Sequence, residues 1–168
     1  MDKDGTRIEM KVEGLTLDPV TNMPIIILKD IEGRRTLPIW VGIFEANAIA
    51  LEMEKINTPR PMTHDLIRNI LDGIDAKVKY VCVNDLRDNT FYAEIGLILH
   101  GMDVKIDSRP SDAIAVALRM KAPIMVALKV VEEARSFDVR PENQIGENDQ
   151  WKGWLDNIKP SDFGNIDQ

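Results

Sequence analysis

The 168-residue chain has few of the residues that most often supply cross-links or chemistry in small proteins. Its one cysteine, Cys82, rules out an intrachain disulfide and lies in the apolar run 80–83, where we interpret it as a small core residue. Only two histidines occur, and no zinc-type spacing of cysteine and histidine is present. No phosphate-binding loop, dinucleotide fingerprint or nucleophile elbow is found. An enzyme built from this chain must therefore use carboxylates, arginines, hydroxyls and His64.

Long apolar runs are also missing. The first six residues are rich in charge and contain no apolar stretch, unlike a secretory signal. No segment approaches the roughly 20 apolar residues that a membrane-spanning helix requires. We therefore expect a cytoplasmic protein that has no membrane segment.

Basic residues are outnumbered by acidic ones. The chain has 21 lysines and arginines against 28 aspartates and glutamates, which gives a net charge of −7. Residues 137–168 hold seven of the acids and three of the bases, so residues 1–136 carry only −3. An acidic chain is repelled by phosphate backbones unless its basic residues cluster. Charge is therefore the strongest compositional argument against a nucleic-acid substrate.

What the sequence does contain is a regular succession of short strands and helices. Apolar residues alternate with charged ones from Ile8 to Leu17, which is typical of a half-buried strand. In the second helix we expect Thr63 to be the N-cap and Leu66, Ile70 and Leu71 to be buried. Periodicity and turn residues together predict strands at 8–17, 24–28, 36–41, 77–86, 90–99, 102–107 and 123–127, and helices at 43–53, 63–73, 110–121 and 130–136.

The second half of the chain resembles the first. An offset of 67 residues aligns Ala46 with Ala113 and places Glu45 opposite Asp112. Small residues on one face let a helix pack closely against a sheet or another helix. We interpret the match as an internal duplication of a β-β-β-α unit, in an α+β fold whose mixed or antiparallel sheet packs against helices. The alternative is a chance alignment of two alanine-rich helices.

The duplication predicts one domain over residues 1–136, with repeat halves at about 7–74 and 75–136. Residues 138–150 are polar and lack periodicity, so we expect a linker over residues 137–150. In the tail, 151–168, apolar residues follow helical spacing from Trp151 to Ile158 and predict a short amphipathic helix. Two turns of helix are marginal alone in water, so this helix should dock on the domain or on a second subunit. A disordered tail is the alternative.

Polar residues gather at the predicted helix starts. Glu45 lies in the first turn of the first main helix, where free backbone N–H groups suit a carboxylate or a phosphate. The stretch 58–65 adds a guanidinium on Arg60, a hydroxyl on Thr63 and an imidazole on His64. The alternatives are that Glu45 only complements the helix dipole and that His64 is structural or merely exposed.

The stretch 107–112 combines five polar side chains around a third helix start, more than capping requires. Ser108 is the expected N-cap, with Pro110 in the first turn. We predict catalytic roles for Asp107, Asp112, Glu45 and His64. Substrate-binding roles are predicted for Arg60, Arg109, Ser108, Ser111 and Thr63. Carboxylates suit hard divalent cations, so Asp107, Asp112 and Glu45 are the candidate ligands of Mg²⁺ or Mn²⁺.

Four blocks of the sequence resemble the bifunctional nuclease family. They are Leu37–Glu54, Thr58–Leu66, Asp85–Ala93 and Asp107–Ala117, and they stand in the family's order. The resemblance covers about residues 8–136, and the closing Lys159–Gly164 is similar to the tail of many bacterial members. It implies an α+β fold built by duplication, homo-oligomers of two or more subunits, and the DNase and RNase activity assigned to some members.

Two functions from different classes follow. The first is a metal-assisted nuclease that acts on DNA, RNA or both, with Arg60 or Arg109 on the phosphate. The second is a non-catalytic binding or regulatory module, acting as an oligomer, in which the polar blocks cap helices and bind a partner or a small anion. A weaker third alternative is a small-molecule pocket lined by the stretches 58–65 and 107–112.

Overall fold

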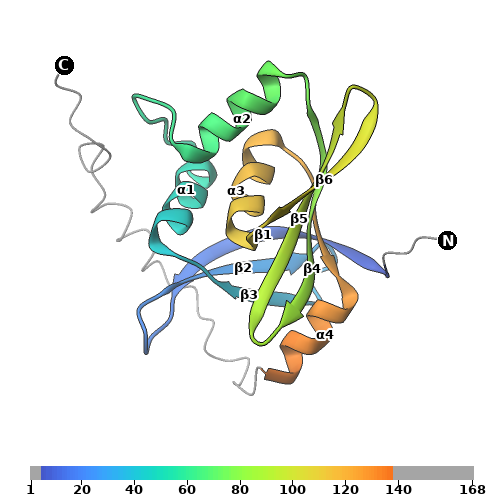
Figure 1. Ribbon diagram of the computed structural model, residues 1–168. Coiled ribbons are helices and arrows are strands. Elements are labelled where there is room, and N and C mark those ends of the chain that lie inside the picture. Colours follow the sequence, from blue (N-terminus) through green and yellow to red (C-terminus); the bar gives the residue numbers. More distant parts are fainter. Residues whose placement is uncertain (1–4, 138–168) are drawn as a thin grey trace.

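The computed structural model describes residues 5–137 and contains one seven-stranded mixed sheet with four helices (Figure 1). This confirms the predicted α+β class. The strands are β1 (Arg7–Leu17), β2 (Pro24–Asp30), β3 (Thr36–Trp40), β4 (Lys77–Arg87), β5 (Thr90–Leu99), β6 (Met102–Ser108) and β7 (Ile124–Ala127). The helices are α1 (Ile43–Met53), α2 (Thr63–Gly73), α3 (Pro110–Met120) and α4 (Leu128–Phe137).

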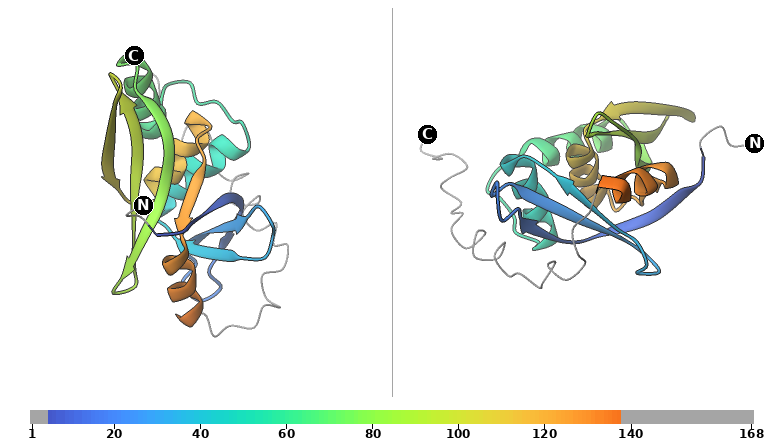
Figure 2. Two further views of the ribbon diagram at one scale, coloured as in Figure 1. Left: turned by 90° about the vertical axis from the view of Figure 1, so that its right-hand side faces the viewer. Right: turned by 90° about the horizontal axis from the view of Figure 1, so that it is seen from below.

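The sheet consists of two antiparallel three-stranded groups joined by one short strand. Its order is β3-β2-β1-β7-β4-β5-β6. The strand β7 runs antiparallel to β1 and parallel to β4, so it holds the two groups together in the middle of the sheet. Figure 2 shows the two groups from the side, with the helices α1 and α3 between them.

The order β-β-β-α occurs twice, as the sequence predicts. Each bound of α3 lies 67 residues after the matching bound of α1, from 43 to 110 and from 53 to 120. Both helices place alanines against the core, and Ala46, Ala50, Ala113 and Ala117 are all buried. The small side chains let α1 and α3 pack on each other. A common origin of the two units stays a prediction.

Apolar side chains from the strands and from the helices pack together to form the core. The most buried side chains include Ile26 and Leu28 of β2, Ile49 of α1 and Ile114 of α3. Cys82 is also fully buried within β4, in agreement with its interpretation as a core residue. Burial of each large aliphatic side chain contributes about 1.5–3 kcal/mol, so this shared core fixes the helix starts relative to the sheet.

Two details of α2 differ from expectation. Leu66 and Ile70 were predicted to be buried, yet they are 53% and 52% exposed. The helix packs on α3 through Ile67, Leu71 and the buried His64, so only one flank of its apolar face is covered. The first helical residue is Thr63, and Met62 rather than Thr63 occupies the N-cap position.

The other helices and strands begin and end within about two residues of the predicted positions. One predicted N-cap differs. Arg109, not Ser108, is the N-cap of α3, and Pro110 is in its first turn as predicted. The predicted linker and tail helix lie beyond residue 137, outside the described residues. Within residues 5–137, no helix is both long and apolar enough to cross a membrane.

Candidate active site

The starts of α1 and α3 lie beside each other, and one arginine connects them. Arg109 donates from Nη2 to Glu45 Oε1 at 2.7 Å and from Nε to Asp112 Oδ2 at 2.8 Å. Both carboxylates are in the first turn of their helix, near the positive end of its dipole. The Arg109 side chain is 66% exposed, so the guanidinium is open to solvent while it bridges the two acids. The three residues form the centre of the candidate site.

His64 extends this cluster to α2. Its Nε2 lies 2.8 Å from Oδ1 of Asp112, the carboxylate oxygen that Arg109 does not use. An ionised carboxylate can only accept, so we assign the proton to Nε2. The Nδ1 atom is buried and has no hydrogen-bond partner among residues 5–137, and the same holds for Oδ1 of Asn47 in α1. His64 therefore supports Asp112 from the interior and does not itself face the solvent.

These contacts determine the charge of Asp112. Partial burial alone would raise the pKa of Asp112, but the hydrogen bonds from His64 and Arg109 outweigh it and hold the pKa below its ordinary value. The hydrogen bonds that Arg109 donates, to Asp112 first and then to Glu45, raise the pKa of Arg109. The site thus holds an ionised Asp112 and a permanently charged Arg109 near neutral pH.

A second ion pair fixes α2 from the other side. Arg119, whose side chain is 2% exposed, donates from Nε to Asp65 Oδ1 at 2.7 Å. Its two terminal nitrogens donate to the carbonyls of Ala48 in α1 and Ala115 in α3, each at 3.0 Å. One guanidinium thereby joins three helices. Because Asp65 follows His64 directly, this tie also positions the imidazole.

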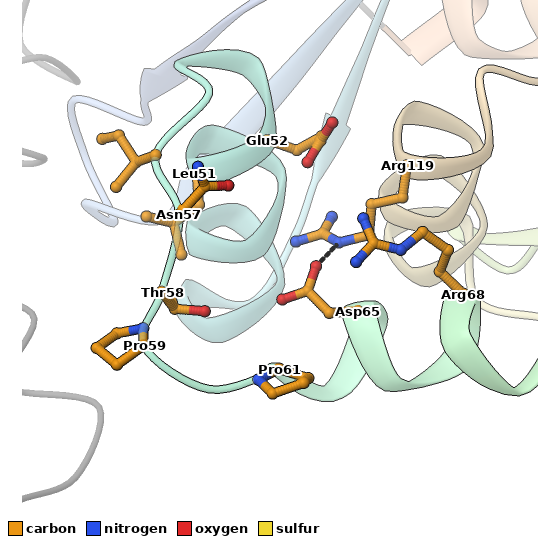
Figure 3. A pocket seen from close by; sticks show the side chains of 10 residues that line it. Leu51, Glu52, Asn57, Thr58, Pro59, Pro61, Asp65, Arg68 and Arg119 are labelled. Carbon is orange, nitrogen blue, oxygen red and sulfur yellow. Dashed lines mark hydrogen bonds and ion pairs between the residues drawn. The ribbon is translucent and has the colours of Figure 1, made fainter. Parts of the chain in front are cut away.

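The Asp65–Arg119 pair forms one wall of a pocket of about 180 Å³ (Figure 3). The other walls come from the end of α1 at Glu52, from Arg68 of α2 and from the loop Ile56–Pro61. Each of the three nitrogens of the Arg119 guanidinium already donates one hydrogen bond. The carboxylates of Glu52 and Asp65 equal in number the guanidinium groups of Arg68 and Arg119, so the pocket lining has no excess of positive charge. We assign it no ligand.

The pair also predicts how stability depends on pH. Partial burial alone would raise the pKa of Asp65, but the backbone N–H of Met62 and the guanidinium of Arg119 hold it below its ordinary value. A carboxyl whose pKa is lower in the folded state stabilises the fold above its unfolded pKa of about 3.9, and this contribution is lost as pH falls through the folded value. We expect the urea midpoint of the natural protein to fall between about pH 5 and pH 3.

Asp65→Asn should make this acid dependence shallower, because the amide does not titrate. Asp75→Asn, in an exposed turn with φ 54°, is the matched control, since asparagine tolerates that backbone conformation. Equal slopes for Asp65→Asn and the natural protein, measured by urea unfolding across the pH range, would contradict the role of Asp65.

The remaining predicted site residues lie around this cluster without joining it. Asp107 is exposed on β6 and pairs in register with Glu94, on the face opposite to Ile106. Within residues 5–137, no hydrogen bond or ion pair connects Asp107 to Glu45 or Asp112. The others are Arg60 and Thr63, which are exposed before and at the start of α2, Ser108, whose Oγ donates to the Arg109 carbonyl, and Ser111, which is buried in the first turn of α3.

Sequence reasoning missed Arg119. A signal was present, because Arg119 directly follows the alanine-rich stretch 113–118 and lies four residues after the buried Ala115, on the same face of the helix. A charged residue on a buried face needs a partner, and the structure supplies Asp65. The identity of that partner depends on how α2 crosses α3, which periodicity does not encode.

The cluster does not fit a preformed metal centre. In the described part of the chain, no group of three or more histidine, cysteine, aspartate or glutamate side chains is placed to hold one ion. Glu45 and Asp112 share Arg109, so one guanidinium already offsets one of their two negative charges. A divalent ion could use both carboxylates only if Arg109 moved away.

Comparison with known proteins places the chain in a family. The model of the bifunctional nuclease domain matches residues 26–138. An uncharacterized protein of Mycobacterium tuberculosis (strain ATCC 25618 / H37Rv) is 36% identical over 162 residues, 92% of this chain and 97% of that protein. Bifunctional nuclease 2 of Arabidopsis thaliana is 30% identical over 139 residues, 73% of this chain and 42% of the plant protein. Bifunctional nuclease 2 of Oryza sativa subsp. japonica is 29% identical over 118 residues, 68% and 36% respectively. The chain therefore belongs to the bifunctional nuclease domain family.

Proposed function

We propose that this protein is a cytoplasmic nuclease that hydrolyses phosphodiester bonds at the Glu45–Arg109–Asp112 cluster. The observation that carries the proposal is the solvent-exposed guanidinium of Arg109 between two carboxylates at helix starts. Arginine binds phosphate oxygens through two parallel hydrogen bonds, and helix N-termini favour anions. The plant relatives named bifunctional nucleases support the same activity.

The roles of the residues follow from their exposure and contacts. Arg109 binds the phosphate and, on doing so, exchanges its contact with Asp112 for the substrate. Asp112, held by His64, then accepts a proton from the attacking water. The new phosphorus–oxygen bond forms as the bond to the leaving oxygen breaks. A solvent water protonates the leaving oxygen, and Asp112 then releases its proton to solvent. Glu45 keeps Arg109 aligned from the side of α1.

Assistance by Mg²⁺ or Mn²⁺, expected from the sequence, stays a prediction, and so do the roles of Asp107, Arg60, Thr63, Ser108 and Ser111. The contacts of Arg109 set a condition for the metal, because the ion and the guanidinium compete for the same two carboxylates. The activity assay therefore includes Mg²⁺, Mn²⁺ and EDTA as separate conditions.

The test is cleavage of labelled DNA and RNA oligonucleotides by protein purified free of other nucleases. Arg109→Gln should lower kcat/KM about 10²- to 10³-fold, because one preorganised cationic donor is lost at the reacting phosphate. Arg34→Gln is the matched control, since Arg34 is an exposed arginine that forms an ion pair with the nearby Glu32. Cleavage by Arg109→Gln at the rate of the natural protein would place the activity elsewhere.

A second candidate, a non-catalytic binding module that acts as an oligomer, is favoured by the exposed apolar residues of α2. Leu66 and Ile70, with Ile74 directly after the helix, are three large apolar side chains at a spacing of four residues. Such a flank suits contact with another protein surface. Absence of turnover, together with a stable complex that Ile70→Ser disrupts in light scattering, would support this function instead.

A further inference from the structure

An exposed aromatic ring stands next to the candidate active site. Phe44 is 86% exposed, in the first turn of α1, and it directly precedes Glu45. Its neighbour Ile43 is also exposed. Water solvates a phenylalanine ring poorly, so a ring in this position is available for contact with a ligand.

Phe44 and Glu45 are consecutive residues in the first turn of α1. Consecutive side chains leave an α-helix about 100° apart, so Phe44 and Glu45 project from the same turn in adjacent directions. The Glu45 carboxylate lies 2.7 Å from Nη2 of Arg109, the group that would hold a phosphate. In the binding mode that we propose below, a nucleotide whose phosphate binds Arg109 places its base against the Phe44 ring.

We propose that Phe44 is a base-stacking residue and that the preferred substrate is single-stranded nucleic acid. The proposal rests on the nuclease function proposed above and adds its substrate class. A ring can stack only on a base whose face is free, which a paired duplex does not offer. Base–aromatic stacking contributes about 1–3 kcal/mol per base and tolerates any sequence. The ring contacts the base and not the sugar, so DNA and RNA strands bind alike.

The charge of the chain supports this substrate class. With a net charge of −7, the protein has little long-range attraction for a phosphate backbone. The described site offers Arg109 as its exposed cation, and two acids flank it. Stacking of a base on Phe44 supplies affinity for the substrate that electrostatic attraction does not. Only an unpaired strand gains this affinity, because its bases have free faces.

The test compares kinetics on a short single strand, the same sequence as a duplex, and an abasic strand of equal length. Phe44→Ala should raise KM for the single strand roughly 5- to 150-fold, the equivalent of about 1–3 kcal/mol at about 1.4 kcal/mol per tenfold. It should leave the abasic strand unaffected. Phe44→Trp should restore affinity, whereas Phe44→Leu should not, because leucine keeps apolar area without a ring.

Met102→Ala is the matched control. Met102 is an exposed apolar residue at the far end of β6, about 20 Å of strand away from Ser108, and its removal should leave KM unchanged. Three results would overturn the proposal: an unchanged KM in Phe44→Ala, full affinity in Phe44→Leu, or a smaller molecular mass of Phe44→Ala in light scattering, which would mean that a second copy covers the ring.

The stacking role and the nuclease function can fail separately. If the natural protein cleaves none of the strands, the proposed activity fails, and equilibrium binding of the labelled single strand then tests Phe44 alone. A loss of affinity in Phe44→Ala but not in Met102→Ala supports the stacking surface. Equal affinities of Phe44→Ala and the natural protein sink it.

Discussion

Replacing Arg119 by methionine is expected to lower the free energy of unfolding by about 3–5 kcal/mol, because removing one partner leaves the other charge of a buried pair uncompensated. Methionine keeps much of the aliphatic volume of arginine but none of its donors. Asp65 loses its 2.7 Å partner, and the carbonyls of Ala48 and Ala115 each lose a hydrogen bond. Urea unfolding at neutral pH measures the change as a lower midpoint.

Two further variants separate the ion pair from a general effect of charge removal. Arg34→Met removes an arginine whose side chain is 77% exposed and paired with Glu32, so it should cost under about 1 kcal/mol. Adding Asp65→Asn to Arg119→Met should recover part of the loss, because the half-buried acid is then no longer charged. A double variant that is less stable by the full sum of the single changes would show that the two residues do not act as a pair.

The elements that the sequence predicts well are those whose periodicity is local. The positions of α1 and α3 follow from apolar residues spaced at three and four along a continuous stretch, and the bounds of the two helices differ by 67 residues. The alternation of β1 is equally local. The insertion of β7 between β1 and β4 was not predicted, because the sheet order depends on contacts between residues far apart in the chain.

The burial of α2 illustrates the same limit. Periodicity correctly indicates that one face of the helix is apolar, but the width of the face that a neighbour covers depends on the crossing with α3. Ile67 and His64 are covered, whereas Leu66 and Ile70 are not. In the candidate site, too, local features were predicted from the sequence and tertiary contacts were not. The repeat placed Glu45 and Asp112 at equivalent helix starts, while the contact of His64 with Asp112 and the pair Asp65–Arg119 arise only from the tertiary arrangement.

Asp112→Asn is the substitution with the largest expected effect on activity. If Asp112 accepts the proton of the attacking water, the neutral amide cannot do so, and kcat should fall about 10²- to 10⁴-fold. The asparagine oxygen can still accept from one neighbour, so the fold should persist with a loss of about 1–3 kcal/mol, the cost of weakening the bonds to His64 and Arg109. Steady-state cleavage of a single-stranded oligonucleotide, with the fold checked by circular dichroism, measures both effects.

Asparagine substitutions at two other aspartates test whether the Glu45–Arg109–Asp112 cluster is catalytic or only structural. Asp75→Asn, in the exposed turn after α2, should leave kcat unchanged. Asp107→Asn tests a residue that the sequence places with Asp112 and the structure places on β6 beside Glu94, and a loss as large as that of Asp112→Asn would return Asp107 to the reacting centre. An Asp112→Asn protein that folds and cleaves at the natural rate would leave the cluster with one role, the capping of α3 and its attachment to α1 and α2. A folded variant that binds the strand but does not cleave it would instead separate binding by Arg109 from proton transfer by Asp112, because only the second step needs the ionised carboxylate.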